Sequence, residues 1–477
     1  MSVLIRPAVP TSRPAAAAAV PPLLPTVGAG WVVPLVGGRQ ARSVHLDVAA
    51  SAPALQRVAD HVAAALPAYA SVHRGAGYLS QLSTALYEQA RQTVGAFVSA
   101  RADDVVVFTR NTTDALNLLA GAVPGDVVVL DVEHHANLLP WRSPRRPYGA
   151  RVVRSASTLA ATEALLAAEL AREPAALLAV TGASNVTGEV PDLRRLADLA
   201  HAAGARLAVD AAQLLPHRGF DLTATGADYV AFSGHKVYAP YGVGALVGRR
   251  DWLDAAEPHL AGGGAVREVT MTDGGASTTW ARSPERHEGG TPAVLGALAL
   301  AEALRALAET GVDRVRAHEA ALRARLVGGL RERGVEPVRI WSDAPDAVGV
   351  VSFAVPGWRS AQVAAYLSAE HGIGVRDGRF CAHPLLARLG VAAGDGLVRA
   401  SLGVGSSSAD VDRLLGALDQ LLADGPRWTY AADGGSCRPS PDDRPAPAWS
   451  ALASLADLDA GSVPASPCTV PSTGADR

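Results

Sequence analysis

Short apolar runs alternate with amphipathic, helix-like stretches along the first 300 or so residues of the chain. Runs of this length that are rich in valine, leucine and alanine are typical of strands covered on both faces. The strand candidates are DDVVVFT from Asp103, GDVVVLD from Gly125, ARVVRS from Ala150, AALLAVTG from Ala175, ARLAVDAA from Ala205 and ADYVAFSG from Ala227. This alternation predicts an α/β fold, with a mostly parallel sheet in a large domain and helices on both faces of the sheet.

Local signals mark the ends of the helices and of the domains. One helix is expected to open at Thr112–Asp114 and to break at Gly125, and another to carry Pro191 in its first turn and to end at Gly204. After Thr291 a long Ala/Leu/Arg helix pattern leads into a smaller α+β domain. We therefore expect a large domain at 43–300, whose first segment can pack with the small domain, and a small C-terminal domain at 301–428. The Pro/Ala-rich tail at 1–42 and the tail at 429–477 are expected to be mostly disordered.

The composition narrows the class of protein. The chain has 477 residues, of which 49% are hydrophobic and 19% charged, with a formal net charge of −3. These values fit a soluble globular enzyme and give no basic patch for nucleic acid. Prolines interrupt the apolar N-terminal stretch, so neither a signal peptide nor a membrane span is expected. Cys381, Cys437 and Cys468 form no metal-type or disulfide pattern, and a cytoplasmic location is expected.

Five of the predicted strands end in polar side chains. Because ligands of open α/β sheets bind outside the carboxyl ends of the strands, we expect these side chains to face one rim. They are, in chain order, Arg110 to Thr113, His134 and His135, Asn185, Asp210 with Gln213, and Ser233 with His235 and Lys236.

The combination indicates pyridoxal phosphate chemistry. The Lys236 amine can form a Schiff base with an aldehyde, and the Asp210 carboxylate can keep a pyridine nitrogen protonated. A helix N-terminus with threonine hydroxyls can bind a phosphate. Taken singly, each residue is more often a solvated side chain or a helix cap, so the prediction rests on the set. No metal is predicted, since the adjacent histidines point to different faces and no second ligand cluster accompanies them.

The motifs also carry a family resemblance. From about His45 to about Leu422 the chain resembles the class V group of fold type I pyridoxal phosphate enzymes. It is most similar to the group II cysteine desulfurases and selenocysteine lyases. The signatures, in family order, are HLDVAASAP, VHRG, EHHANLLPW, SNVTGE, VDAAQ, SGHKVYAPYGVGAL, AGGG, TTW, EGGTP, CAHPLL and VRASLGV.

The resemblance implies a role for each matching position. It implies that Lys236 forms the Schiff base, that Asp210 pairs with the ring nitrogen and that His134 stacks over the ring. It also implies a homodimer in which Thr291 reaches the phosphate of the partner's cofactor. Gln213 and Asn185 are expected near the ring, Thr112, Thr113, Ser233 and His235 at the phosphate, and Arg399, His73 and Arg376 at the amino-acid substrate.

The role of Cys381 distinguishes between the possible reactions of this site. In desulfurases the cysteine at this place attacks the substrate sulfur and leaves as a persulfide, which a sulfur-acceptor protein can then receive. This chain has Asp377, Arg379 and Phe380 where those enzymes usually show a threonine and two histidines. The expected reaction of this chain is removal of sulfur from L-cysteine through a persulfide on Cys381. The alternatives are transamination or carbon–sulfur cleavage of another amino acid at the same site, and a non-catalytic protein that kept the fold.

Overall fold

The computed structural model describes residues 18–392, 395–433 and 436–450. A seven-stranded sheet forms the centre of the larger part, in the order β4-β11-β10-β9-β7-β5-β6. Every strand runs parallel to the others except β11, which is antiparallel to both of its neighbours. The strands are β4 Asp104–Thr109, β5 Val127–Leu130, β6 Ala150–Val153, β7 Leu177–Thr181, β9 Arg206–Asp210, β10 Tyr229–Ser233 and β11 Gly244–Arg249. The six predicted strands are confirmed.

Successive side chains of these strands enter two different hydrophobic cores. In β4, Val105 and Val107 belong to one core, whereas Val106 and Phe108 belong to the other. The same division holds in β5, β7, β9 and β10. Because side chains along a strand alternate between faces, continuous apolar runs are what a sheet covered on both sides requires.

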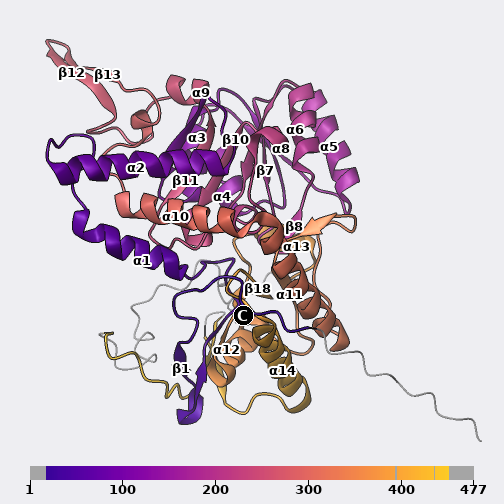
Figure 1. Cartoon of the computed structure of the whole chain (residues 1–477). Coiled ribbons are helices and arrows are strands. Elements are labelled where there is room, and N and C mark those ends of the chain that lie inside the picture. The colour runs from indigo at the N-terminus through magenta and orange to yellow at the C-terminus, as the bar shows by residue number, and fades with distance from the viewer. Residues whose placement is uncertain (1–17, 393–394, 434–435, 451–477) are drawn as a thin grey trace, which may run out of the picture.

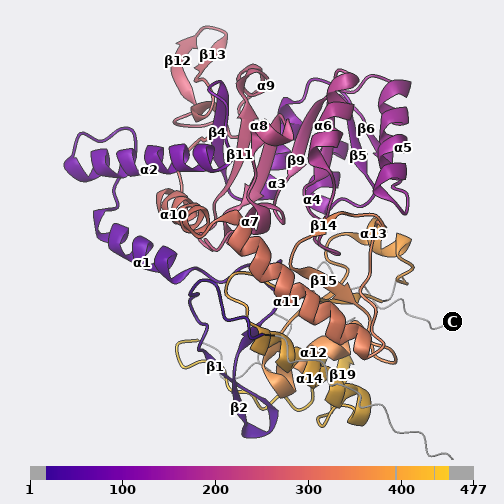
Figure 2. The ribbon, with the colours of Figure 1, turned by 45° about the vertical axis from the view of Figure 1, so that its right-hand side comes forward.

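Helices cover both faces of the sheet, as Figures 1 and 2 show. The helix α3 lies against one face and shares its core with α4 and α9, while α2, α5, α6 and α10 contribute to the other core. The helices of this part are α1 Gln56–Ala65, α2 Tyr78–Phe97, α3 Thr112–Ala122, α4 His135–Leu138, α5 Leu159–Arg172, α6 Leu193–Ala202, α7 Leu215–Arg218, α8 Leu222–Thr225, α9 Arg250–Ala255 and α10 Val294–Thr310. The expected break at Gly125 comes later than the end of α3, and Pro191 precedes α6, whose N-cap is Asp192.

The smaller part has its own hydrophobic core and lies below the large sheet in Figure 1. Its antiparallel sheet has the order β15-β18-β17. Its elements are α11 Val312–Glu332, β15 Val350–Phe353, α12 Ser360–His371, β17 Arg376–Gly378, α13 His383–Arg388, β18 Leu397–Ser401 and α14 Ser408–Asp424. The short strand β3 Val44–His45 pairs with β16 Ile373–Gly374, so the first segment does pack with the small domain.

Three parts of the expected organisation differ from the structure. The boundary expected at residue 300 falls inside α10, which packs on α1 and α2, so the chain leaves the large domain at Gly311. Residues 18–42 are not a loose tail. They form the hairpin of β1 Val32–Pro34 and β2 Gln40–Arg42, and they bury Leu35 and Val36.

The third difference concerns the C-terminal segment. Residues 426–433 and 436–444 pack on the small domain through the pair of β19 Tyr430–Asp433 and β20 Ser436–Pro439, of which β20 contacts α12. Glu370 of α12 accepts hydrogen bonds from the backbone N–H groups of Arg427 and Trp428 and from the Tyr430 hydroxyl. The Pro and Ser content of a segment does not predict such long-range contacts. The pattern WSALASLADLDA in this tail predicts a short helix, but only its first two residues, Trp449 and Ser450, are among the described residues. Cys468 lies outside them.

Two further two-stranded pairs lie outside the large sheet. The strands β8 Glu189–Val190 and β14 Asp346–Ala347 pair where the two parts meet. The hairpin of β12 Val266–Thr272 and β13 Gly275–Trp280 projects from the large domain, at the upper left of Figure 1. Among the described residues, no helix has the length and apolar character needed to cross a bilayer.

Candidate active site

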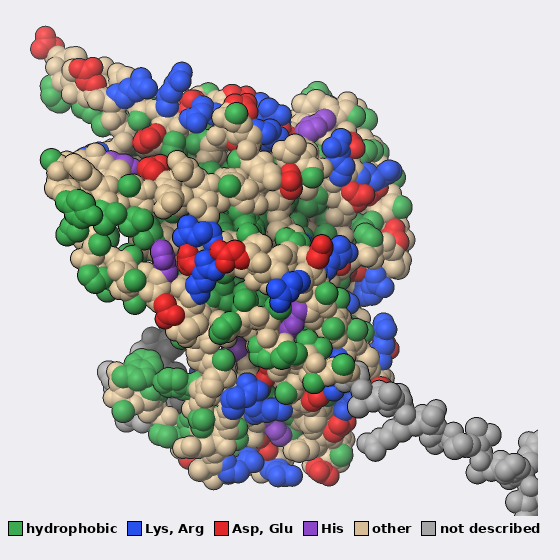
Figure 3. Space-filling model, viewed as in Figure 1, with side chains coloured by type: hydrophobic (Ala, Val, Ile, Leu, Met, Phe, Trp, Pro, Cys, Tyr) green, Lys and Arg blue, Asp and Glu red, His purple; other side chains and the backbone are tan. Residues whose placement is uncertain are grey.

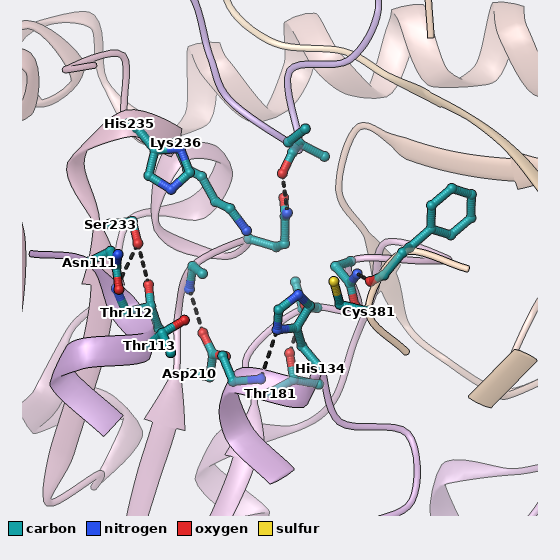
Figure 4. A pocket seen from close by; sticks show the side chains of 18 of the residues that line it. Asn111, Thr112, Thr113, His134, Thr181, Asp210, Ser233, His235, Lys236 and Cys381 are labelled. Carbon is teal, nitrogen blue, oxygen red and sulfur yellow. Dashed lines mark hydrogen bonds between the residues drawn. The ribbon is translucent and has the colours of Figure 1, made fainter. Parts of the chain in front are cut away.

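A cavity of about 270 Å³ opens at the carboxyl ends of β4, β5, β7, β9 and β10 and is closed from the other side by the small domain. All but two of the predicted site residues line it (Figure 4). They are Thr112, Thr113, His134, Asn185, Asp210, Gln213, Ser233, His235, Lys236, Arg376, Cys381 and Arg399. The five strand ends thus converge on one rim, but Arg110 and His135, which were expected there too, do not line the cavity.

The N-terminus of α3 forms one end of the cavity. Asn111 caps the helix by accepting the backbone N–H of Asp114 at 3.0 Å. The Ser233 hydroxyl accepts the Thr112 N–H at 2.8 Å and lies 2.6 Å from the Thr112 hydroxyl. Backbone N–H groups and hydroxyls at the positive end of a helix dipole form a binding site for an anion, phosphate included.

Lys236 reaches into the cavity from a short 3-10 turn, Gly234–Lys236, directly after β10. It is the only lysine in the sequence, which otherwise carries its positive charge on arginine. Burial lowers the pKa of Lys236 to about 8, although the Asp210 carboxylate acts in the opposite direction. A substantial fraction of this amine is therefore neutral, and hence nucleophilic, near neutral pH.

Asp210 and Gln213 line the same cavity as the lysine, and Gln213 has an unpartnered acceptor there. Asp210 is 5% exposed, and burial raises the pKa of its carboxyl, while the Ala212 N–H and Lys236 act to lower it. A buried carboxylate of this kind is stabilised by a cation beside it. Gln213 donates its Nε2 to the Ala49 carbonyl at 2.7 Å, and its buried Oε1 has no partner among the described residues. This pair therefore fits a ligand with a protonated nitrogen and a hydroxyl group.

His134 stands at the N-cap of α4. Its Nδ1 accepts the Ala136 N–H at 3.0 Å, so the neutral ring carries its proton on Nε2. Burial, together with Lys236, lowers the pKa of His134 to about 3. The ring is therefore neutral at physiological pH and can stack on a flat ligand as well as hold or pass a proton.

Arg399, on β18 of the small domain, is 4% exposed and is the buried cation of the cavity's far wall. It donates to the Asp47 carboxylate at 3.0 Å and to the Asn185 carbonyl at 3.1 Å. Its Nε has no partner among the described residues. A guanidinium with a spare donor inside a cavity is suited to binding a carboxylate.

Cys381 belongs to a loop of the small domain that closes the cavity. Figure 4 shows its sulfur on the side away from Ser233 and Thr112, with Asp210 and His134 between them. The Cys381 carbonyl accepts the His135 N–H at 2.8 Å, and the Phe380 carbonyl accepts Asn185 Nδ2 at 2.8 Å. Arg376 lines the cavity but Asp377 does not, because successive residues of β17 face opposite sides. The Asp377 carboxylate is thus not part of the cavity wall.

Thr291 and His73 are the two predicted residues that the structure does not bring to this cavity. Both line a separate hollow of about 620 Å³, together with Arg74, Glu288 and the glycines around them. Glu288 holds this segment through Arg91, the Tyr87 hydroxyl and the Phe108 N–H. Within one chain, these two residues cannot act on the Lys236 site.

Sequence reasoning missed the roles of three residues, two in the cavity wall and one, Asp47, behind it. Asp47 forms the ion pair with Arg399, and Phe380 lays its ring on the same guanidinium, 5.1 Å from ring centroid to Cζ. Thr181, at the end of β7, lines the cavity between Asn185 and Asp210. Asp47 stands in the quoted motif HLDVAASAP, so a signal for it was present.

A family model provides the comparison that decides the family. The model described as "Aminotransferase class-V" matches residues 44–414, well over half of the chain. The chain belongs to the class V aminotransferase family. This is a family of pyridoxal phosphate-dependent enzymes of fold type I, and the fold predicted from the sequence is confirmed.

Relatives of this chain within the class V family are named as cysteine desulfurases. The chain is 38% identical over 387 residues to a cysteine desulfurase of Dickeya dadantii, a match that covers 79% of this chain and 91% of the relative. It is 36% identical over 390 residues to a cysteine desulfurase of Haloferax volcanii, with 79% and 88% covered. These matches confirm the resemblance to the desulfurase branch of the class V family.

Solved structures of class V enzymes resemble the chain to a similar extent. The apo structure of cysteine desulfurase from Thermococcus onnurineus superposes with a TM-score of 0.73 at 33% identity, covering 80% of this chain and 94% of that one. The cysteine desulfurase CsdA from Escherichia coli gives a TM-score of 0.71 at 34% identity with the same coverage.

Proposed function

We propose that the protein is a pyridoxal phosphate-dependent cysteine desulfurase that removes sulfur from L-cysteine through Cys381. One observation carries this proposal: the Cys381 thiol shares a single cavity with Lys236, Asp210 and Arg399. An amine, a buried carboxylate, a carboxylate-binding guanidinium and a nucleophilic thiol are the groups that the reaction needs.

The residues present fit the cofactor. Ser233, His235 and the threonines at the start of α3 would hold its phosphate, and Asp210 would face its ring nitrogen. The unpartnered Oε1 of Gln213 would accept its ring hydroxyl, and His134 would cover the ring. When bound, pyridoxal phosphate supplies an electron sink for bonds around the substrate Cα.

Lys236 and Arg399 then act on the amino acid. Arg399 would bind the substrate carboxylate in place of Asp47 and so fix the orientation of Cα. Lys236, whose pKa is about 8, would take the proton from Cα as a neutral amine, and His134 would pass a proton through Nε2.

Cys381 would perform the sulfur step. Its thiolate attacks the sulfur of the substrate, a new S–S bond forms, and the bond between substrate Cβ and sulfur breaks. The electron pair of that bond stays with the carbon, which a proton converts into the methyl group of alanine. Cys381 keeps the sulfur as a persulfide, which a thiol of an acceptor protein can remove.

A homodimer would complete the site. Thr291 and His73 lie outside the Lys236 cavity of their own chain, so they would serve the partner's cofactor and substrate. Figure 3 shows hydrophobic side chains gathered at its left edge, where α1 and α2 meet. The large exposed side chains there are Leu66, Tyr69, Tyr78 and Leu79. An apolar surface of this kind favours association with a second copy.

The sole lysine gives a sharp test of the cofactor site. Reduction with borohydride in the presence of pyridoxal phosphate is expected to attach one pyridoxyl group per chain, on the Lys236 peptide. The Lys236→Ala variant should lose that label and show no visible absorbance from bound cofactor. A label distributed elsewhere, or equal labelling of the variant, would exclude this role of Lys236.

The sulfur step is tested by a pair of cysteine variants. Alanine release from L-cysteine should be abolished in Cys381→Ser and unchanged in Cys437→Ser, because Cys437 lies on β20 outside the cavity. Both variants should keep the pyridoxyl label. Undiminished alanine formation by Cys381→Ser would instead support carbon–sulfur cleavage without a persulfide. Products from a panel of other amino acids would reveal transamination.

A further inference from the structure

The residue that carries the thiol and the residue before it both have a left-handed backbone conformation. Phe380 has φ 51° and Cys381 has φ 52°, in the region that glycine prefers. A non-glycine residue in this region is strained and persists only where the surroundings hold it. The placement of the Cys381 sulfur therefore depends on whatever holds these two residues.

Long-range contacts hold both residues. The Asn185 amide donates to the Phe380 carbonyl at 2.8 Å, and the His135 N–H donates to the Cys381 carbonyl at 2.8 Å. The Phe380 ring, 4% exposed, lies over the guanidinium of Arg399 at 5.1 Å. A cation on the face of an aromatic ring is attracted to it, most strongly where water is excluded.

Arg399 also contacts Asn185, one of the residues that hold this segment. It donates to the backbone carbonyl of Asn185, the residue whose side chain holds Phe380, and it pairs with Asp47. The group proposed to bind the substrate carboxylate and the segment that carries the thiol are thus packed as one unit. A ligand carboxylate at Arg399 would therefore meet a guanidinium that already contacts Asp47, Asn185 and the Phe380 ring.

We propose that Phe380 is a positioning residue that makes the reactivity of Cys381 depend on a carboxylate bound at Arg399. This inference rests on the proposed function of Arg399 as the substrate carboxylate site. When an α-amino acid binds, the guanidinium and the Phe380 ring move together, and the Cys381 backbone follows. An amino acid derivative without a carboxylate leaves the thiol where it was.

The chemistry of Phe380 suits this task. Its ring has no hydrogen-bonding group, so it contacts the guanidinium through its face without competing for a carboxylate oxygen. The desulfurases that the chain resembles usually have a histidine here, which would add a titratable group beside Arg399. In this chain the residue between Arg399 and Cys381 is phenylalanine, which has no ionisable group.

The test measures the thiol directly. Holoenzyme is treated with limiting iodoacetamide, and the alkylation rate of the Cys381 peptide is followed by mass spectrometry, with the Cys437 peptide as the internal reference. The rate is measured with L-alanine, which has a carboxylate, and with L-alaninamide, which has none. We expect the two ligands to give Cys381 rates that differ at least about threefold, and equal rates at Cys437.

Three variants decide the interpretation. Phe380→Leu removes the aromatic face and should bring the ratio of the two rates close to one, whereas Phe380→Tyr should keep the wild-type ratio. Phe353→Leu, a buried phenylalanine on β15 of the same domain, should also keep it. If Phe380→Leu does not take up one pyridoxyl group per chain, Phe380→Met replaces it as the test variant.

Two results would overturn the inference. One is a wild-type ratio of one, and the other is an unchanged ratio in the leucine or methionine variant. Neither result touches the proposed function, which fails instead if Cys381→Ser still releases alanine from cysteine. The two failures are therefore distinguishable.

Discussion

The cofactor cradle and the Cys381 loop face each other across one cavity but are built in different ways. The cradle consists of strand ends and the first turn of α3, so regular hydrogen-bonded backbone sets its geometry, and the bond between Thr112 and Ser233 ties two of these elements together. The loop, 379–382, has two residues with left-handed backbone, Phe380 and Cys381. They are held by hydrogen bonds from Asn185 and His135, which lie far away in the sequence. Regular elements thus position the cofactor, whereas long-range tethers position the thiol.

This difference has a functional consequence. Damage to the cradle should remove every reaction of the site, because each one needs the cofactor. Damage to the loop should remove sulfur transfer and leave cofactor binding intact. Variants on the two sides of the cavity should therefore affect cofactor binding and sulfur transfer separately.

Asp210→Asn should lower activity more than a change in the Cys381 loop or a single hydroxyl deletion in the cradle. It removes the buried charge that faces the ring nitrogen. Loss of one member of a buried ion pair costs about 3–5 kcal/mol. Since about 1.4 kcal/mol corresponds to a factor of ten, kcat should fall by about 100-fold or more. The measurement is alanine release together with transamination of added amino acids, and both should fall.

A matched control is Asp192→Asn, which alters the N-cap of α6 outside the cavity. Asparagine caps helices as well as aspartate does, so this variant should keep wild-type kcat. Equal activity of the Asp210 variant and the control would contradict the assignment of the cradle.

Asn185→Ala should affect the loop more than the cradle. It leaves the buried Phe380 carbonyl without its donor, a loss worth about 1–3 kcal/mol. We expect alanine release to fall about tenfold, while the pyridoxyl label on Lys236 stays at one per chain. A loss of label together with activity would show that Asn185 serves the cradle instead, and the comparison between the regions would fail at this residue.

The pH dependence of cofactor attachment belongs to the cradle alone. The pKa of Lys236 is lowered to about 8, so the reactive neutral amine predominates above pH 8 and the protonated form below it. The rate of attachment to apoprotein should rise about tenfold per pH unit below pH 8 and level off above it. The pKa values of His134 and His235, about 3 and about 4, leave neither histidine to titrate in this range. A midpoint near the ordinary lysine value of 10.5 would contradict the lowered pKa.

The same contrast explains what the sequence could predict. Strand runs, helix caps and the polar strand ends are local patterns, and they indicated the sheet and nearly all of the cradle. The contacts of Phe380, Asp47 and Asn185 join segments far apart in sequence, and no local pattern encodes them. The packing of residues 18–42 and of the β19–β20 hairpin was missed for the same reason, since their Pro- and Ser-rich composition does not show which distant surface they cover.

Thr112→Ala should have the smallest effect and tests the finest detail of the cradle. The variant removes one hydroxyl that lies 2.6 Å from the Ser233 hydroxyl at the proposed phosphate end. A single hydrogen bond contributes about 0.5–1.5 kcal/mol, so the Kd for pyridoxal phosphate should rise by about two- to tenfold. The control is Thr158→Ala, which removes a comparable threonine at the N-cap of α5, far from the cavity lining. That control should lower Tm without changing the Kd, because it loses a helix cap and no ligand contact. A Kd that rises equally in both variants would mean that the effect comes from loss of stability, and the phosphate would then have to be assigned to another part of the cavity.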